Sequence, residues 1–101
     1  MTITRHSHLM ANKGFFTKRR IDKNQKEIVD ALKSVGCSVL TLADRGKGVP
    51  DLLVGHRGHN YLVEVKSEKG KLTEDQEKFF NLWHGAVMIF RSAEEAIEFF
   101  A

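Results

Sequence analysis

GVPDLLVGHRGHNYLVEVKSEKGK, residues 48–71, is the stretch on which the fold depends. It contains two short apolar runs, 51–55 and 60–66, on either side of the polar segment 56–59, which includes a glycine. Apolar runs of this length around a glycine-containing turn are typical of a β-hairpin. The sequence therefore predicts two antiparallel strands joined by a tight turn.

The register of this hairpin places two acidic side chains opposite each other. With the turn centred between Arg57 and Gly58, Asp51 is directly opposite Glu64. Directly opposed side chains have Cβ atoms about 4.5–5.5 Å apart, so two carboxylates there require a shared proton or a cation. Side chains two residues apart on a strand share a face, which adds Lys66 to the same place. We expect these three groups to converge.

Two carboxylates and an ammonium group are a set that can hydrolyse phosphate esters. Mg²⁺ and Mn²⁺ prefer oxygen ligands and are held by one or two carboxylates together with water and phosphate. A lysine beside the ion can position the attacking water and stabilise the charge that develops on the phosphate. Taken singly, Pro-Asp at a strand start and Glu-x-Lys on a strand face are ordinary structural features. Their combination, at a spacing that opposes the acids, favours a metal site.

The same residues carry a resemblance to a known family. Asp51, followed after residues 52–63 by Glu64-Val65-Lys66, resembles the PD-(D/E)XK nuclease signature. From about Gln25 to about Phe99 the chain is similar to the virus-type replication-repair nuclease (VRR-NUC) domain. The motifs that carry this resemblance are Gly48-Val49-Pro50-Asp51, Glu64-Val65-Lys66, Gly70-Lys71-Leu72-Thr73 and Gln76-x-x-Phe79.

The resemblance implies a metal-dependent endonuclease that hydrolyses phosphodiester bonds in DNA. Asp51, Glu64 and the backbone carbonyl of Val65 would hold Mg²⁺ or Mn²⁺, and Lys66 would align the attacking water. The resemblance also implies a structure-selective enzyme for branched DNA, such as a four-way junction. A homodimer is implied as well, because one small chain carries one site and two strands must be cut.

Two glutamines are candidates for a supporting role. Gln25 lies on the apolar face of the expected first helix, where it either reaches the site or is a buried amide. Gln76 follows Thr73 at the spacing of a capping box, which is a structural role. The resemblance offers Gln76 a second role near the catalytic lysine or the substrate backbone, and the two roles are compatible.

Two glycine-containing basic loops flank the proposed site. Residues 44–48 precede Asp51, and residues 67–72 follow Lys66. Glycine lets a backbone approach a ligand closely, and basic side chains can meet phosphates, although such loops can also be merely flexible. The residues that we expect to contact DNA are Arg45, Lys47, Lys69 and Lys71.

The expected fold is an α/β sandwich with a PD-(D/E)XK-like core. Helical spacing of Ile28, Leu32 and Val35 predicts a helix over 22–35, and an apolar run predicts a strand over 37–43. After the hairpin come a second helix over 73–84, a strand over 86–90 and a last helix opened by Ser92. The order is αβββαβα, with an antiparallel meander and a crossover in a central mixed sheet. In the second helix, four apolar residues are expected in the core: Phe79, Phe80, Leu82 and Trp83.

The composition limits the class of protein. A chain of 101 residues forms one domain, and 42% hydrophobic with 29% charged residues is ordinary for a globular protein. A net charge of +3 permits a nucleic-acid partner without requiring one, and a single cysteine excludes an internal disulfide. Neither a membrane-spanning run nor a secretory signal is present in the sequence. We therefore expect a cytoplasmic protein, bacterial or in a host cell if phage-encoded.

The first part of the chain is expected to lie outside the domain. Residues 1–20 predict a basic, flexible arm before a single nuclease-like domain over 21–101, and residues 1–9 resemble an alternative leader or a cloning remnant. The arm either contacts a DNA backbone or is a solvated lead-in whose two phenylalanines pack on the core. Its residues are Lys13, Phe15, Phe16, Lys18, Arg19 and Arg20.

Two other classes of function fit parts of this pattern. One is a catalytically silent DNA-binding module of the same fold, and the other is a small assembly protein whose acid pair binds a structural cation. Neither use requires Lys66. The complete set of Asp51, Glu64 and Lys66 therefore favours the nuclease interpretation.

Overall fold

The structure is a computed structural model that describes residues 19–42 and 45–101. The predicted arm up to residue 18 and the loop residues 43–44 lie outside the described residues. In chain order the elements are α2 (Arg19–Ser34), β1 (Ser38–Thr41), β2 (Leu52–His56), β3 (His59–Val65), α3 (Glu74–Leu82), β4 (Val87–Phe90) and α4 (Ala93–Phe100).

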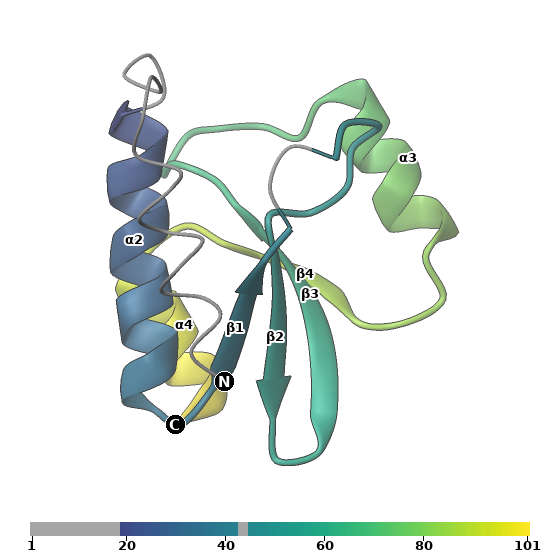
Figure 1. The fold of residues 1–101 in the computed structure, drawn as a ribbon. Coiled ribbons are helices and arrows are strands. Elements are labelled where there is room, and N and C mark those ends of the chain that lie inside the picture. Colours follow the sequence, from purple (N-terminus) through teal and green to yellow (C-terminus); the bar gives the residue numbers. More distant parts are fainter. Residues whose placement is uncertain (1–18, 43–44) are drawn as a thin grey trace.

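The four strands form one mixed sheet in the order β1-β2-β3-β4. β1, β2 and β3 are an antiparallel meander, and β4 returns parallel to β3 after the crossover through α3. Helices α2 and α4 lie together against one side of the sheet, and α3 lies on the other side near one end (Figure 1). The αβββαβα order and the mixed sheet of the predicted fold are confirmed.

The core lies between the sheet and the layer formed by α2 and α4. Ile28 and Leu32 of α2 are fully buried, and so are Leu52, Val54 and Val63 of the hairpin. Full burial of an aliphatic side chain stabilises a fold by about 1.5–3 kcal/mol. From α4, Ala96 and Phe100 complete the same cluster. One face of the hairpin is therefore fixed against the helices.

The prediction of a buried second helix is wrong. Within the described chain, α3 has no buried side chain. Leu82 is 76% exposed and Trp83 47% exposed, whereas Phe79 and Phe80 are half-buried. The reason is architectural: the core is already enclosed by α2, α4 and the sheet, and α3 lies beside the end of the sheet rather than over its centre (Figure 1).

Element boundaries differ from the expected ones by a few residues. α2 begins at Arg19, three residues before the predicted start, and so includes the last two residues of the predicted arm.

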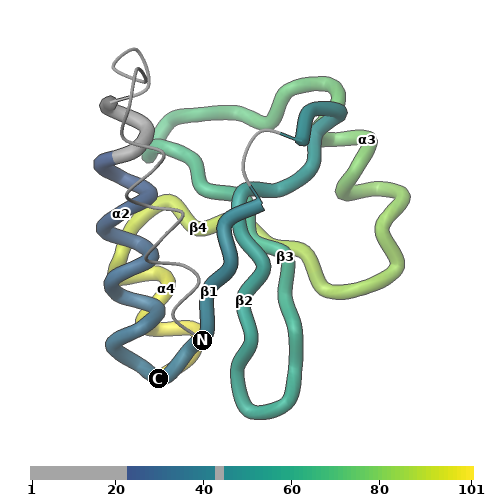
Figure 2. Tube along the Cα trace, viewed as in Figure 1, coloured from purple at the N-terminus to yellow at the C-terminus, as the bar shows by residue number. Residues whose placement is uncertain are grey.

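Figure 2 traces the chain from the end of β3 toward α2 and then past one end of the sheet to α3. No helix in the described part of the chain is both long and apolar enough to span a bilayer.

Candidate active site

The hairpin has the predicted register. Leu52 pairs with Val63 and Leu53 with Leu62, and the turn at Arg57 and Gly58 has positive φ angles of 51° and 84°. Two positive φ values are the signature of the tight turn that best fits the twist of a hairpin. Continued by one pair, this register sets residue 51 against residue 64.

The two acids lie on the sheet face that points away from the core. Leu52, Val63 and Val65 belong to the core cluster between the sheet and the helices. Because side chains alternate along a strand, Asp51 and Glu64 project to the opposite face. This is also the side of the sheet on which α3 lies (Figure 1). The predicted arrangement of both carboxylates on one face is present in the fold.

Asp51 is held by a backbone group of the neighbouring strand. Its Oδ2 accepts a hydrogen bond from the Val65 N–H, with 2.8 Å between oxygen and nitrogen. Burial raises the pKa of Asp51, while the Val65 N–H and the Lys66 charge act in the opposite direction. The carboxyl is therefore fixed in place at the start of β2, where Pro50 directly before it is fully buried.

Glu64 is a buried acid with an unsatisfied oxygen. The residue is 3% exposed. Burial first, and then the charge of Asp51, raise the pKa of Glu64 to about 7, against the lowering effect of Lys66. Its Oε1 is buried and has no hydrogen-bond partner among the described residues. A buried, unpaired carboxylate oxygen is costly, so it marks a place where a cation or a proton is needed.

Lys66 provides the positive charge of the group. Its Nζ lies 3.7 Å from Glu64 Oε2, and its side chain is only 16% exposed. Its backbone is held on both sides, because its N–H donates to the Phe90 carbonyl at 3.1 Å and its own carbonyl accepts from Asn24 Nδ2 at 3.0 Å. The ammonium group is thus anchored at the end of β3, beside the acid pair.

Gln76 forms the predicted capping box and also contacts the acid pair. Its side-chain Oε1 accepts from the Thr73 N–H at 2.8 Å, and its backbone N–H donates to Thr73 Oγ1 at 3.2 Å, which is a complete capping box. Its Nε2 donates to Glu64 Oε2 at 2.9 Å. One amide therefore joins the first turn of α3 to the buried acid.

The supporting contact from α2 comes from a different residue than the one predicted. Gln25 is half-buried and makes no hydrogen bond to another described residue. Its neighbour Asn24 reaches the carbonyl of Lys66 instead. Asn24 precedes the buried Ile28 by one helical turn, so the helical spacing already placed it on the inward face. Glu27 is exposed, as its position on the helix predicts.

The four residues predicted to contact DNA lie on the surface, not among the buried groups of the site. Arg45, Lys47, Lys69 and Lys71 are all exposed. Arg45 donates through Nε to the Leu42 carbonyl at 3.0 Å. Sequence reasoning missed Arg91, whose Nη1 donates to the carbonyls of Ser67 at 2.8 Å and Gly70 at 2.6 Å. Arg91 therefore fixes the shape of the loop that carries the two lysines after Lys66.

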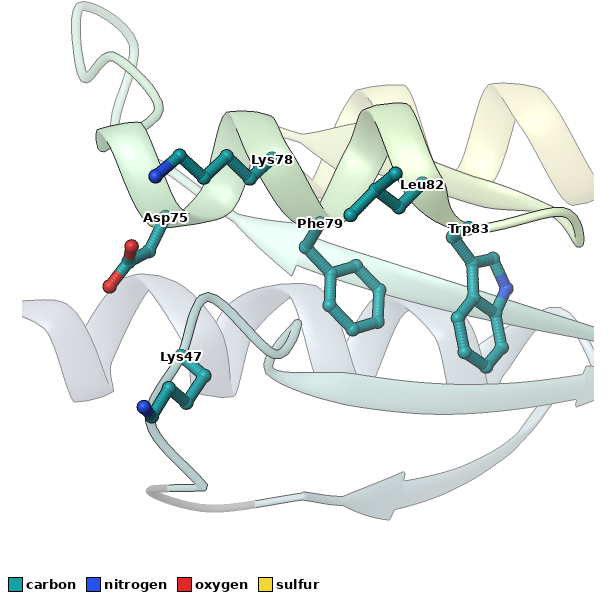
Figure 3. Close-up of a pocket in the computed structure, with 6 residues that line it drawn as sticks. All are labelled: Lys47, Asp75, Lys78, Phe79, Leu82 and Trp83. Carbon is teal, nitrogen blue, oxygen red and sulfur yellow. The ribbon is translucent and has the colours of Figure 1, made fainter.

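A shallow pocket of about 320 Å³ lies beside α3. It is mostly apolar, and the rings of Phe79 and Trp83 stack with centroids 5.2 Å apart and planes 15° apart (Figure 3). The lining residues are Lys47, Asp75, Lys78, Phe79, Leu82 and Trp83. None of the acids of the site lines this pocket, so it is a separate feature of the surface.

Comparison with known proteins places the chain in a family. The family model of the VRR-NUC domain matches residues 41–93, which is more than half of the 101 residues. The chain belongs to the VRR-NUC family. A solved structure of a VRR-NUC domain is 28% identical, with a TM-score of 0.64, and the likeness covers 76% of this chain and 89% of that chain. No curated protein matches the chain.

Membership in the VRR-NUC family gives this chain a nuclease-type, DNA-processing function. The matched segment 41–93 contains the acid pair, Lys66 and Gln76, whereas Asn24 lies before it. Nucleases of this family generally use divalent metal ions. The described residues contain no group of three or more His, Cys, Asp or Glu side chains that could hold a metal. A metal here would therefore depend on two carboxylates, backbone carbonyl oxygen and water.

Such a donor set fits Mg²⁺ or Mn²⁺. Both ions accept one or two carboxylates and keep several water ligands, so they do not need a cage made of protein side chains alone. The unpartnered Oε1 of Glu64 is the structural feature that a bound cation would satisfy. The residues present are therefore compatible with the metal that the family uses.

Proposed function

We propose that this VRR-NUC domain is a metal-dependent endonuclease that hydrolyses phosphodiester bonds in branched DNA. The observation that carries the proposal is the buried Glu64 with its unpartnered Oε1, next to Asp51 and 3.7 Å from the ammonium group of Lys66. A bound cation would compensate this buried oxygen, which otherwise needs a proton shared with Asp51.

In this proposal Asp51, Glu64 and the Val65 carbonyl hold Mg²⁺ or Mn²⁺. When bound, the ion polarises the phosphate and offsets the charge of the transition state. Lys66 orients the water whose oxygen attacks phosphorus. As that bond forms, the water loses a proton to solvent, the phosphorus–oxygen bond of the leaving strand breaks, and the leaving oxygen takes a proton from solvent. The ammonium group of Lys66 stabilises the negative charge that develops on the phosphate. Gln76 keeps the carboxylate of Glu64 in one orientation through its 2.9 Å hydrogen bond.

The loops on either side of the site supply the contacts to the DNA backbone. Arg45 and Lys47 lie on one loop, and Lys69 and Lys71 lie on the other, which Arg91 holds in shape. Phosphate contacts of this kind fix the position of the duplex without reading its sequence. Contacts from these two loops would therefore recognise the shape of branched DNA and not its sequence.

The test is a cleavage assay on supercoiled, linear, single-stranded and four-way-junction DNA with Mg²⁺, Mn²⁺ or EDTA. We expect cleavage with either ion, strongest on the junction, and none in EDTA. Lys66→Ala should lower the rate at least about a hundredfold, which is the typical cost of removing one transition-state donor. The matched control is Lys33→Ala, an exposed lysine of α2, which should cleave like the wild type. Equal activity of Lys66→Ala and wild type would refute the mechanism.

Cutting both strands of a junction calls for a second copy of the chain, so the proposal includes a homodimer. Support comes from the C-terminal end of α3, where Leu82 and the following residue Trp83 expose large apolar side chains. Asp75 and Lys78 beside them carry opposite charges, which suits a two-fold interface where each surface meets its own copy (Figure 3). Sedimentation should give a dimer for the wild type and a monomer for Leu82→Glu. A wild type that sediments as a monomer at every concentration would exclude the dimer.

A further inference from the structure

In the loop before Asp51, Gly48 lies so close to the first turn of α3 that there is no space for a side chain at this position. A Cβ atom added to Gly48 would lie 2.3 Å from the Asp75 carbonyl oxygen and 2.7 Å from the Gln76 nitrogen. Atoms without a hydrogen bond between them do not approach to such distances, and both obstacles are backbone atoms that cannot rotate away. Figure 3 shows Lys47, the residue before Gly48, on the loop opposite Asp75.

A hydrogen bond and a buried proline hold this loop near Gly48, which limits how far the loop can move to relieve the clash. The Val49 N–H donates to the Gly46 carbonyl at 3.1 Å and closes a turn around Gly48. The next residue, Pro50, is fully buried and leads directly into Asp51. A side chain at position 48 would therefore push the first turn of α3 away from the strand that carries Asp51.

The same turn of α3 delivers Gln76 to Glu64. The side chain of Gln76 is held by the Thr73 N–H at one end and donates to Glu64 Oε2 at the other, at 2.9 Å. Relieving a 2.3 Å contact to an ordinary van der Waals distance requires a movement of about 1 Å. A shift of this size takes a hydrogen bond of 2.9 Å beyond its useful range.

We infer that Gly48 is a positioning residue of the active site. Because it has no side chain, the first turn of α3 can pack close enough for Gln76 to reach Glu64. This inference rests on the proposed function, in which Glu64 binds the metal. Gly48 does not touch the reacting atoms and acts only through Gln76. Residues that orient a metal ligand in this way commonly contribute a factor of about 10–100 to metal affinity.

The simpler role for Gly48 is to provide a left-handed backbone conformation for the turn. Its φ is +77°, a conformation in which a side chain is strained whatever the surroundings. Gly46, two residues earlier, separates the two roles, because its φ is +72° and no described atom lies within 4 Å of an added Cβ. Gly46→Ala introduces the same kind of strain without the contact to α3, so it is the matched control for Gly48→Ala.

The experiment compares wild type, Gly46→Ala, Gly48→Ala, Gln76→Ala and the double variant Gly48→Ala/Gln76→Ala. Binding of Mn²⁺ alone, without DNA, is measured by calorimetry. We expect Gly48→Ala and Gln76→Ala each to weaken binding about tenfold, and Gly46→Ala to stay within about twofold of wild type. The double variant should bind as weakly as the single ones, because both substitutions break the same contact.

A second measurement does not depend on metal binding. In metal-free protein, the side-chain amide of Gln76 should exchange its protons slowly in wild type and Gly46→Ala and quickly in Gly48→Ala, as followed by NMR. Slow exchange in Gly48→Ala, or multiplicative losses of Mn²⁺ affinity in the double variant, would overturn the inference. If wild type fails to bind Mn²⁺ while the exchange pattern holds, the metal-dependent function is wrong and the positioning by Gly48 stands.

Folding of the variant is part of the same test. Because α3 has no buried side chain within the described chain, displacing its first turn leaves the core intact. We therefore expect Gly48→Ala to melt cooperatively and with the circular dichroism of Gly46→Ala. Global unfolding of Gly48→Ala alone would show that the glycine serves the whole fold, which contradicts a specific positioning role.

Discussion

The carboxylate of Asp51 accepts a hydrogen bond from the backbone N–H of Val65, with 2.8 Å between Oδ2 and nitrogen. The bond joins the start of β2 to the end of β3, just beyond the last pair of the ladder, Leu52 and Val63. It uses one oxygen of Asp51 and leaves the other for a cation or for the proton of Glu64. The acid pair is thus fixed by backbone geometry before any metal binds.

The raised pKa of Glu64 predicts that the metal-free protein loses stability as pH rises. Its pKa is 4.5 in the unfolded chain and about 7 in the fold, so the folded state binds more protons between these values. The contribution is fully present below pH 4.5 and is lost as pH rises through about 7. The free energy of unfolding in EDTA, measured with urea, should fall by up to about 3 kcal/mol between these limits.

Glu64→Gln is the control for this pH dependence. The amide cannot titrate, so the variant should lose the part of the pH slope that lies between pH 4.5 and about 7. All other side chains are the same in both proteins, so their contributions cancel in the comparison. Parallel stability curves for wild type and variant would mean that Glu64 is not the protonated group.

Divalent metal should stabilise the fold through Asp51. At a Mg²⁺ concentration ten times the dissociation constant, the free energy of unfolding should rise by about 1.4 kcal/mol relative to EDTA. Asp51→Asn should abolish this gain in a thermal melt. Asp30→Asn, which changes an exposed acid paired with Lys26 on α2, should keep it. Equal gains for both variants would place the ion elsewhere.

The loop after Lys66 should contribute to DNA binding through its charges. Lys69 and Lys71 are exposed, and Arg91 holds their loop in one shape. If each lysine neutralises one phosphate, replacing both by alanine lowers the slope of log affinity against log salt by about 2. Fluorescence anisotropy with a labelled four-way junction in EDTA measures this slope. An unchanged slope would exclude the loop from the interface, and Lys33→Ala on α2 serves as the control.

Substitution of two leucines should lower the free energy of unfolding by different amounts, because only one of them lies in the core. Leu32 is fully buried between α2 and the sheet, whereas Leu40 on β1 is 45% exposed. Leu32→Ala should lower the free energy of unfolding by about 2–5 kcal/mol, because it opens a cavity in the core. Leu40→Ala should cost less than about 1 kcal/mol. Similar urea midpoints for the two variants would contradict the assignment of the core to the α2 side of the sheet.

The sequence was sufficient for the hairpin because one of its faces is buried. Shifting the pairing by one residue would turn Leu52 and Val63 out of the core, so the register is strongly specified. The positive φ angles at Arg57 and Gly58 form a tight turn that favours the same register. Local pattern and tertiary packing agree here, and the relation of Asp51 to Glu64 follows from them.

The burial of the second helix was predicted wrongly, because an apolar sequence pattern does not show which elements cover the core. Four apolar residues in the second helix suggested a core position, but α2 and α4 already enclose the core, and Leu82 is left exposed. The contacts of Asn24 and Arg91 were missed for another reason. Helical spacing places Asn24 on the inward face, but it does not reveal which group Asn24 meets. Each residue donates to a backbone carbonyl far away in the sequence, and such a partner leaves no local signal.

Helix α3 carries a part of the site while burying no side chain of its own within the described chain. Elements with little buried area open at a lower free energy than the core does. Heating should therefore detach this helix, and Gln76 with it, while the strands and α2 are still folded. Nuclease activity should then disappear several degrees below the calorimetric melting temperature, so the working range of the enzyme is set by its most weakly anchored helix.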